Sequence, residues 1–155
     1  MSSLPDLSGL GELEILYLHD NALSSVPAWI GALRSLTYLN VSENPLGELP
    51  AEIGRLESLL ELRALDLRLS ALPALDGLVS LRELHLRRNA FTALPDSVRA
   101  LRALRLLDLR SNRLASLPAW IAELPDLQKL DLRWNDPVLE PPAALLARGC
   151  VVLTE

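Results

Sequence analysis

The chain has 155 residues, a net charge of −5 and 50% hydrophobic residues, yet only 4% aromatic ones. This length is typical of one domain, and the acidic balance argues against a nucleic acid or an anionic membrane as the main partner. The N-terminus lacks a basic segment followed by an apolar run, and no stretch approaches the ~20 apolar residues of a membrane span, so we expect a cytoplasmic protein.

A leucine pattern recurs along the chain every 23 residues, with one interval of 22. Each unit contains a segment of the form L-x-x-L-x-L-x-x-N, clearest as LRLLDLRSN from Leu104 to Asn112. In an extended segment the side chains alternate between two faces, so the inner leucines point into a core and the residues between them face solvent. One unit cannot bury its apolar face alone, which predicts stacked units with a shared core. The units start at Leu13, Leu36, Leu59, Leu81, Leu104 and Leu127.

This pattern, with the trailing L-x-x-L-P-x-x-I of each unit, resembles the 23-residue subclass of the leucine-rich repeat family, and the resemblance covers roughly Leu4 to Asn135. The family implies an α/β solenoid with a curved parallel β-sheet on its concave side and irregular or short helical returns on its convex side. It also implies that the concave sheet holds other proteins, and it implies no catalytic chemistry. The subclass occurs in many intracellular signalling and bacterial proteins. A single lysine beside fourteen arginines also favours a bacterial source.

Two further columns of residues are interpreted as structural. An asparagine follows the strand segment in five units, where an amide can pair with backbone groups that the turn leaves free. A proline follows the second turn and disfavours a regular strand or a long helix, which predicts an irregular return with short helical turns. The asparagines are Asn21, Asn44, Asn89, Asn112 and Asn135, and the prolines are Pro27, Pro50, Pro73, Pro95 and Pro118.

Residues 1–12 read as a partial repeat whose strand is absent, because Leu4–Leu10 matches Leu72–Leu78 almost place for place. Solenoids normally cover their first core layer with a polar cap, and none is evident here. Two explanations stay open: the chain is cut from a longer protein or begins naturally short, or its exposed edge pairs with another copy. We therefore expect a monomer or a weak homodimer formed through that edge.

The third unit departs from the pattern. If it starts at Leu59, Ala64 occupies a core leucine position and Leu67 occupies the asparagine position. A rival register starts at Leu62 and restores the strand motif, but it makes the preceding unit 26 residues long and this one 19. We favour the start at Leu59. Leu65 then projects to solvent on the concave side, whereas the rival register places it in the core.

Residues 136–155 leave the repeat pattern and are interpreted as a C-terminal cap. Pro141 and Pro142 can start a short helix over residues 143–147, Gly149 can end it, and residues 150–153 read as a last edge strand. Cys150 then lies against the terminal core layer. This favours a buried structural thiol over a reactive one, because reactivity needs an electropositive and accessible setting.

Residues with catalytic or metal-binding potential are few. The histidines His19 and His85 lie on strands 66 residues apart, and the sequence has no H-E-x-x-H, no paired cysteines and no glycine-rich phosphate loop. Equal positions two units apart are separated by about 10 Å, which is too far for a catalytic triad. We therefore expect no enzyme, no cofactor and no metal site, with His19 lying at a solvated strand end.

The solvent-facing side of the strands carries the candidate binding residues. We expect two patches on it: an aromatic and apolar patch towards the N-terminus and a row of arginines edged by a tryptophan towards the C-terminus. Arginine with aromatic neighbours is a composition typical of protein-binding hot spots. The candidate residues are Tyr17, His19, Tyr38, Arg63, His85, Arg87, Asp108, Arg110, Asp131, Arg133 and Trp134.

The arginine row admits two interpretations. Arginines and aspartates on neighbouring strands can pair simply to keep a polar face soluble, or the arginines can bind a partner. The same question applies to Trp29 and Trp120, which occupy matching P-A-W-I segments on the return side. They either cover the edge of the leucine core, which we favour, or form a second contact surface.

Two function classes follow. The first is a non-catalytic module that binds a protein or peptide of unknown identity on the concave face, with no nucleic acid and no membrane as partner. The second is a structural scaffold, engineered or truncated, for which the partial first repeat and the altered third unit are the evidence in the sequence. This second class includes self-association through the exposed edge.

Overall fold

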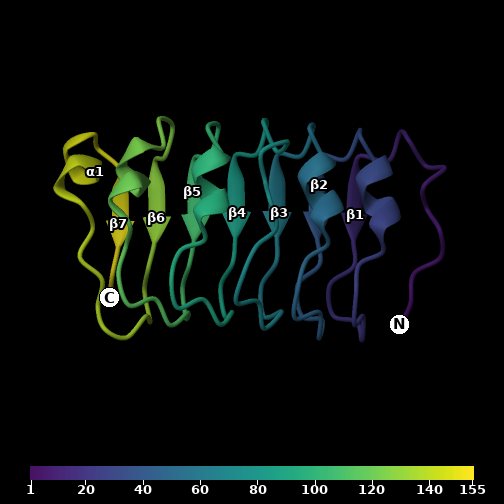
Figure 1. Ribbon diagram of the computed structural model, residues 1–155, viewed down its shortest axis with the longest axis horizontal. Coiled ribbons are helices and arrows are strands. Elements are labelled where there is room, and N and C mark those ends of the chain that lie inside the picture. Colours follow the sequence, from purple (N-terminus) through teal and green to yellow (C-terminus); the bar gives the residue numbers. More distant parts are fainter.

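The computed structural model describes residues 1–155 and contains one seven-stranded parallel sheet whose strands follow chain order from β1 to β7 (Figure 1). The short helices lie along the other side of the solenoid from the strands, and the two termini lie at its opposite ends. The predicted solenoid, with a parallel sheet on one side and short helical returns on the other, is therefore confirmed. The strands are β1 Ile15–Tyr17, β2 Tyr38–Asn40, β3 Glu61–Arg63, β4 Glu83–His85, β5 Leu106–Asp108, β6 Lys129–Asp131 and β7 Val151–Leu153.

The core is a continuous stack of leucines between the sheet and the returns. The central leucines of successive strands pair in register, and those of β2 to β6 are fully buried, as Leu39, Leu84 and Leu107 illustrate. At the N-terminal end Leu16 of β1 is only half-buried, because no strand lies on its outer side. No helix of the protein is both long and apolar enough to cross a membrane.

The third strand pairs through Leu62, which lies opposite Leu39 of β2 and Leu84 of β4. This is the register that starts the third unit at Leu59, and Leu59 itself is fully buried. Leu65 is half-buried rather than part of the core. The favoured register was therefore the right choice, and the shortening of this unit falls on its return.

Short 3₁₀ helices form the returns of four units, and a proline in extended conformation immediately precedes each of them. The fixed φ of proline suits this entry into a helix. The predicted short helical turns are thus present in these units. The helices are η1 Ala28–Ala32, η2 Ala51–Arg55, η3 Asp96–Ala100 and η4 Ala119–Glu123.

The return after Pro73 has no such helix. Two residues lie between Pro27 and the buried Ile30, but only one lies between Pro73 and the buried Leu75, so the helical turn has no room. The backbone of this return instead lies directly against the preceding one. A Cβ built on Gly77 would overlap the carbonyl oxygen of Gly54, so only glycine fits there.

The asparagines form the expected ladder beneath the turns. Asn44, for example, accepts a hydrogen bond from the Leu23 amide and donates to the Leu18 and Val41 carbonyls. Leu67 interrupts this ladder with a fully buried side chain. The preceding turn differs where the asparagine is missing: Gly47 takes a φ of +72° and donates its amide to the Leu67 carbonyl.

The C-terminal residues form the expected helix and edge strand. Helix α1 spans Ala143–Ala147, Gly149 follows it with a φ of +81°, and β7 pairs with β6. Cys150 is 6% exposed, and burial raises the pKa of its thiol. These features match a packed structural cysteine, because a raised pKa disfavours the reactive thiolate.

Candidate functional site

The solvent-facing side of the sheet holds the candidate residues in three groups along the solenoid axis. The N-terminal group is aromatic: the ring of Tyr17 lies 4.9 Å from that of Tyr38 and 5.8 Å from that of His19. Tyr17 is 60% exposed, and its neighbour Ile15 on the same strand is 53% exposed. Burial raises the pKa of Tyr38, which is held more deeply in the sheet. This group presents aromatic rings and aliphatic surface to solvent.

The C-terminal group contains two bidentate ion pairs. Arg110 binds both carboxylate oxygens of Asp108, at 2.9 and 2.6 Å, and Arg133 binds those of Asp131 at 2.9 and 2.8 Å. Each pair joins residues two apart on one chain segment, and a weaker contact of 3.5 Å joins Arg110 to Asp131 across the sheet. The aspartates are 3% and 4% exposed. Two of the three arginines therefore neutralise buried carboxylates.

The pKa of Asp108 shows how strongly its neighbours hold it. Burial alone raises the pKa of a carboxyl group, but the interactions with His85 and Arg110 outweigh burial and hold the pKa of Asp108 well below its usual range. The hydrogen bond to Asp108 likewise raises the pKa of Arg110. Asp108 is thus an ionised buried group whose charge depends on the arginine beside it.

We expect the Arg110→Ala substitution to lower the free energy of unfolding by about 3 kcal/mol, because it leaves the buried Asp108 carboxylate without its bidentate partner. The matched substitution is Arg99→Ala, which breaks a pair of 2.6 Å with Glu123 whose side chains are both more than half exposed. That pair is expected to contribute less than about 1 kcal/mol. Urea unfolding of the two variants measures the difference, and equal losses would contradict this assignment.

Arg87 differs from the other two arginines. Its position two residues back holds His85 instead of an aspartate, it makes no ion pair, and its buried Nε has no hydrogen-bond partner. The guanidinium carbons of Arg87, Arg110 and Arg133 lie 5.7, 6.0 and 5.3 Å from the ring of Trp134. Trp134 is 58% exposed and has a φ of +60°. The C-terminal group therefore contains one arginine without a carboxylate partner, Arg87, beside the exposed indole of Trp134.

A third group, between the other two, was missed by sequence reasoning. Glu61 of β3 lies directly opposite Glu83 of β4, and His85 lies on the same face of β4. One ligand atom of each residue lies within 4.8 Å of the other two. Arg63 also belongs here, with its Nε 2.6 Å from Glu61 Oε1. The two glutamates occupy equal positions in neighbouring repeats, which indicates that they lie side by side. A search for histidine and cysteine motifs alone does not find this group.

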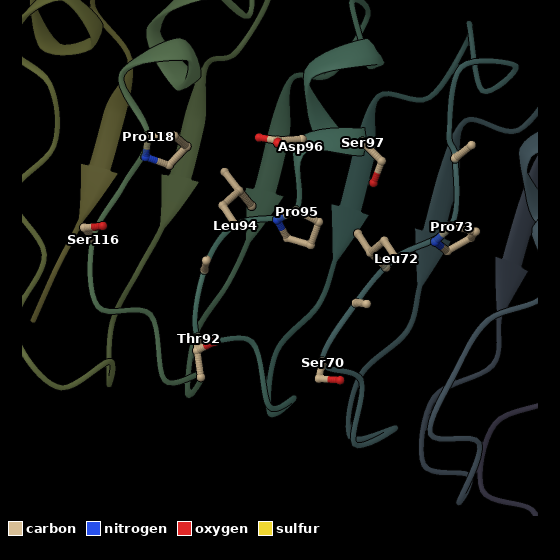
Figure 2. Close-up of a pocket in the computed structure, with 13 residues that line it drawn as sticks. Ser70, Leu72, Pro73, Thr92, Leu94, Pro95, Asp96, Ser97, Ser116 and Pro118 are labelled. Carbon is tan, nitrogen blue, oxygen red and sulfur yellow. The ribbon is translucent and has the colours of Figure 1, made fainter.

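The return side carries a groove of about 550 Å³ beside the missing 3₁₀ helix (Figure 2). Leu72, Leu94 and prolines line it, together with the hydroxyl groups of Ser70 and Thr92. Asp96 at its edge already accepts a hydrogen bond from the Trp120 indole. The groove gathers no set of ionisable groups, so it supports no acid–base or metal chemistry.

The remaining candidate positions have structural settings. Trp29 and Trp120 are half-buried and pack against the leucine core. His19 is exposed at the end of β1, as expected. The concave face therefore holds the clustered polar and aromatic side chains, while the return-side tryptophans cover the core.

Comparisons with known proteins agree with this architecture. The leucine-rich repeat pattern matches residues 7–46 and 79–136. A leucine-rich repeat protein of Leptospira interrogans is 31% identical, with a TM-score of 0.80 over 94% of this chain and 38% of its own. An internalin of Listeria monocytogenes shares the fold at 21% identity and a TM-score of 0.76, over 95% of this chain and 42% of its own. No curated protein matches the chain.

A plant structure is also similar: the ectodomain of the membrane receptor kinase GASSHO1/SCHENGEN3 of Arabidopsis thaliana, solved in complex with CASPARIAN STRIP INTEGRITY FACTOR 2. It is 26% identical, with a TM-score of 0.70 over 94% of this chain and 22% of its own. The chain thus spans less than half the length of each of these proteins. Because the family pattern covers more than half of its residues and solved repeats superpose on almost all of it, the chain belongs to the leucine-rich repeat family.

Proposed function

We propose that the chain is a non-catalytic module that binds an acidic protein segment on its concave face. Membership of the leucine-rich repeat family supports binding as the class of function. The similar plant ectodomain was solved with a bound factor, which supports a protein or peptide as the class of partner. Neither a nucleic acid nor a membrane is part of this proposal, given the net charge of −5.

The unpaired state of Arg87 is the observation that carries the proposal. A guanidinium that lacks a carboxylate can pair with one from a partner through its terminal amino groups, since the Nε of Arg87 is buried. Trp134 lies beside it and can bury against an aliphatic or aromatic side chain of the same partner. The expected ligand therefore pairs an aspartate or glutamate with a neighbouring apolar residue.

The N-terminal aromatic group extends the proposed surface. Tyr17 and Ile15 are exposed on the same face of β1 and offer contacts for apolar side chains of a partner. A bound segment that reaches both ends of the sheet would place its acidic residue at Arg87 and its apolar residues over β1 and β2. The central glutamates would repel acidic side chains between these two points.

We expect an Arg87→Glu substitution to weaken binding about tenfold or more, because it replaces a charge-assisted hydrogen bond with repulsion. The probe is a library of random peptides selected on the wild type, with the affinity of enriched peptides then measured by calorimetry. Arg55→Glu is the matched control, since it makes the same charge change at an exposed residue on the return side, at the end of η2. Arg110 and Arg133 are unsuitable for this purpose because they hold buried aspartates.

Two results would count against the proposal. Peptides that bind Arg87→Glu and the wild type equally would remove the arginine from the site. Peptides that lose affinity through Arg55→Glu instead would move the site to the return side. A melting temperature unchanged in both variants is the control for folding.

The second candidate function is a structural solenoid that self-associates through β1. Its support is the open outer edge of β1, where Ile15 and Tyr17 are exposed and Leu16 is half-buried. An unpaired strand edge is a template for pairing with another chain. A sedimentation experiment over a range of concentrations distinguishes the two candidates, since only this one requires a dimer. The bacterial source and the cytoplasmic location stay predictions.

A further inference from the structure

Three ligand-type atoms converge at the centre of the concave face. His85 Nε2 lies 3.2 Å from Glu83 Oε2 and 3.6 Å from Glu61 Oε1. Zn²⁺ bound by nitrogen and oxygen at about 2.0–2.1 Å in a tetrahedral site places its ligand atoms about 3.3 Å apart. The two separations from Nε2 are close to that value, and all three ligand atoms lie within 4.8 Å of one another, so side-chain rotations would bring them around one ion.

The carboxylates around His85 favour a positive charge close to its ring. A neutral imidazole has one N–H and one lone pair, yet carboxylates lie on both sides of this ring, with Asp108 Oδ2 3.9 Å from Nδ1. The buried Asp108 carboxylate lies on the Nδ1 side of the ring, so it favours the N–H on Nδ1 and leaves the Nε2 lone pair facing Glu61 and Glu83. Glu61 and Glu83 are also like charges directly opposite on neighbouring strands, which is unfavourable, and of the two only Glu61 has an arginine partner. A cation between the three groups would bind the Nε2 lone pair and offset the repulsion between the two glutamates.

We infer that Glu61, Glu83 and His85 bind a divalent transition-metal ion of the Zn²⁺ class on the concave face. An imidazole ligand favours such an ion over Mg²⁺ or Ca²⁺, which prefer oxygen ligands alone. The Asp108 carboxylate behind the ring and Arg63 beside Glu61 orient these ligands as outer partners do in known metal sites. Three protein ligands leave one coordination position open, and it faces the surface on which we propose that a partner lies.

The test is calorimetry of Zn²⁺ with protein that has been stripped of metal by chelator and returned to a non-coordinating buffer. We expect one saturable site per chain, which weakens at least tenfold in His85→Ala and in Glu83→Gln. His19→Ala is the matched control, because His19 is exposed and lies outside the cluster. Glu83 has a side chain 44% exposed, so Glu83→Gln is expected to fold normally even where His85→Ala does not.

Nitrogen NMR of the histidine rings provides a second readout. On addition of Zn²⁺ the Nε2 resonance of His85 should shift while Nδ1 keeps its proton, and the His19 ring should not change. The inference is overturned if the wild type shows no saturable site, if Glu83→Gln binds Zn²⁺ as tightly as the wild type, or if His85 Nε2 is unaffected. Peptide binding is measured separately, so failure of this site leaves the role of Arg87 unaffected.

Discussion

Replacing Asn89 with alanine should lower the free energy of unfolding by about 4 kcal/mol. The Asn89 side chain accepts hydrogen bonds from the buried amides of Leu67 and Leu69, at 3.1 and 3.0 Å, and donates to the Ala64 and Leu86 carbonyls. The two amides have no other partner. Leu67 occupies the neighbouring ladder position and has no side-chain amide, so the loss is not compensated. Urea unfolding of the variant measures the effect.

The other ladder asparagines provide a graded comparison. Asn112 serves one buried amide, that of Phe91, so Asn112→Ala should cost less than Asn89→Ala. Asn21 is half-buried and donates to carbonyls near the open end of the solenoid, so Asn21→Ala should cost least. If the three variants lose equal stability, the special position of Asn89 beside Leu67 would be refuted.

Replacing Gly77 with alanine should lower stability by about 3 kcal/mol or more, because the added methyl group would overlap the Gly54 carbonyl oxygen. The obstacle is backbone rather than the end of a flexible side chain, so two returns must separate to make room. Gly54→Ala should act in the same direction, with its Cβ 2.6 Å from the Ala74 carbonyl oxygen. Thermal and urea unfolding of both variants measure these losses.

Gly9→Ala is the matched control for this pair. A Cβ on Gly9 would have no atom within 4 Å, so the substitution should change stability by less than about 0.5 kcal/mol. A Gly77→Ala variant as stable as Gly9→Ala would show that the return after Pro73 does not pack as closely as the structure has it.

The repeat pattern alone predicts the sheet and its register. Leucines recur every 22 or 23 residues, and stacking one unit on the next leaves only one pairing that buries all of them, as Leu39, Leu62 and Leu84 show. The start of the third unit at Leu59 was favoured because its shortened return, Leu72–Leu78, has a precedent in Leu4–Leu10, and the pairing of Leu62 agrees with it. The terminal helix was found from Pro142 and Gly149, which mark its ends.

The return after Pro73 was expected to resemble the others, but it lacks their 3₁₀ helix. A deletion of one residue is visible in the sequence, while its consequence depends on the three-dimensional packing of Gly77 against Gly54. The groove beside this return has no sequence motif of its own.

The details of the concave face were predicted only in part. Strand alternation assigns Arg87, Arg110 and Asp108 to one face, but it does not say which long side chains pair. The structure shows that Arg110 forms an ion pair with Asp108 and that Arg87 forms none with any carboxylate. The proximity of Glu61, Glu83 and His85 was missed for a related reason, since their approach depends on rotamers that the sequence does not specify.

The most direct test of the proposed function is to map where a selected peptide binds, using NMR chemical-shift changes of backbone amides and tryptophan indoles. We predict large changes at Arg87, at Trp134 and along β4 to β6, and almost none at Trp29 or Trp120. Changes confined to the return side, around the groove near Leu72 and Leu94, would contradict a concave binding face and move the functional surface to the other side of the solenoid.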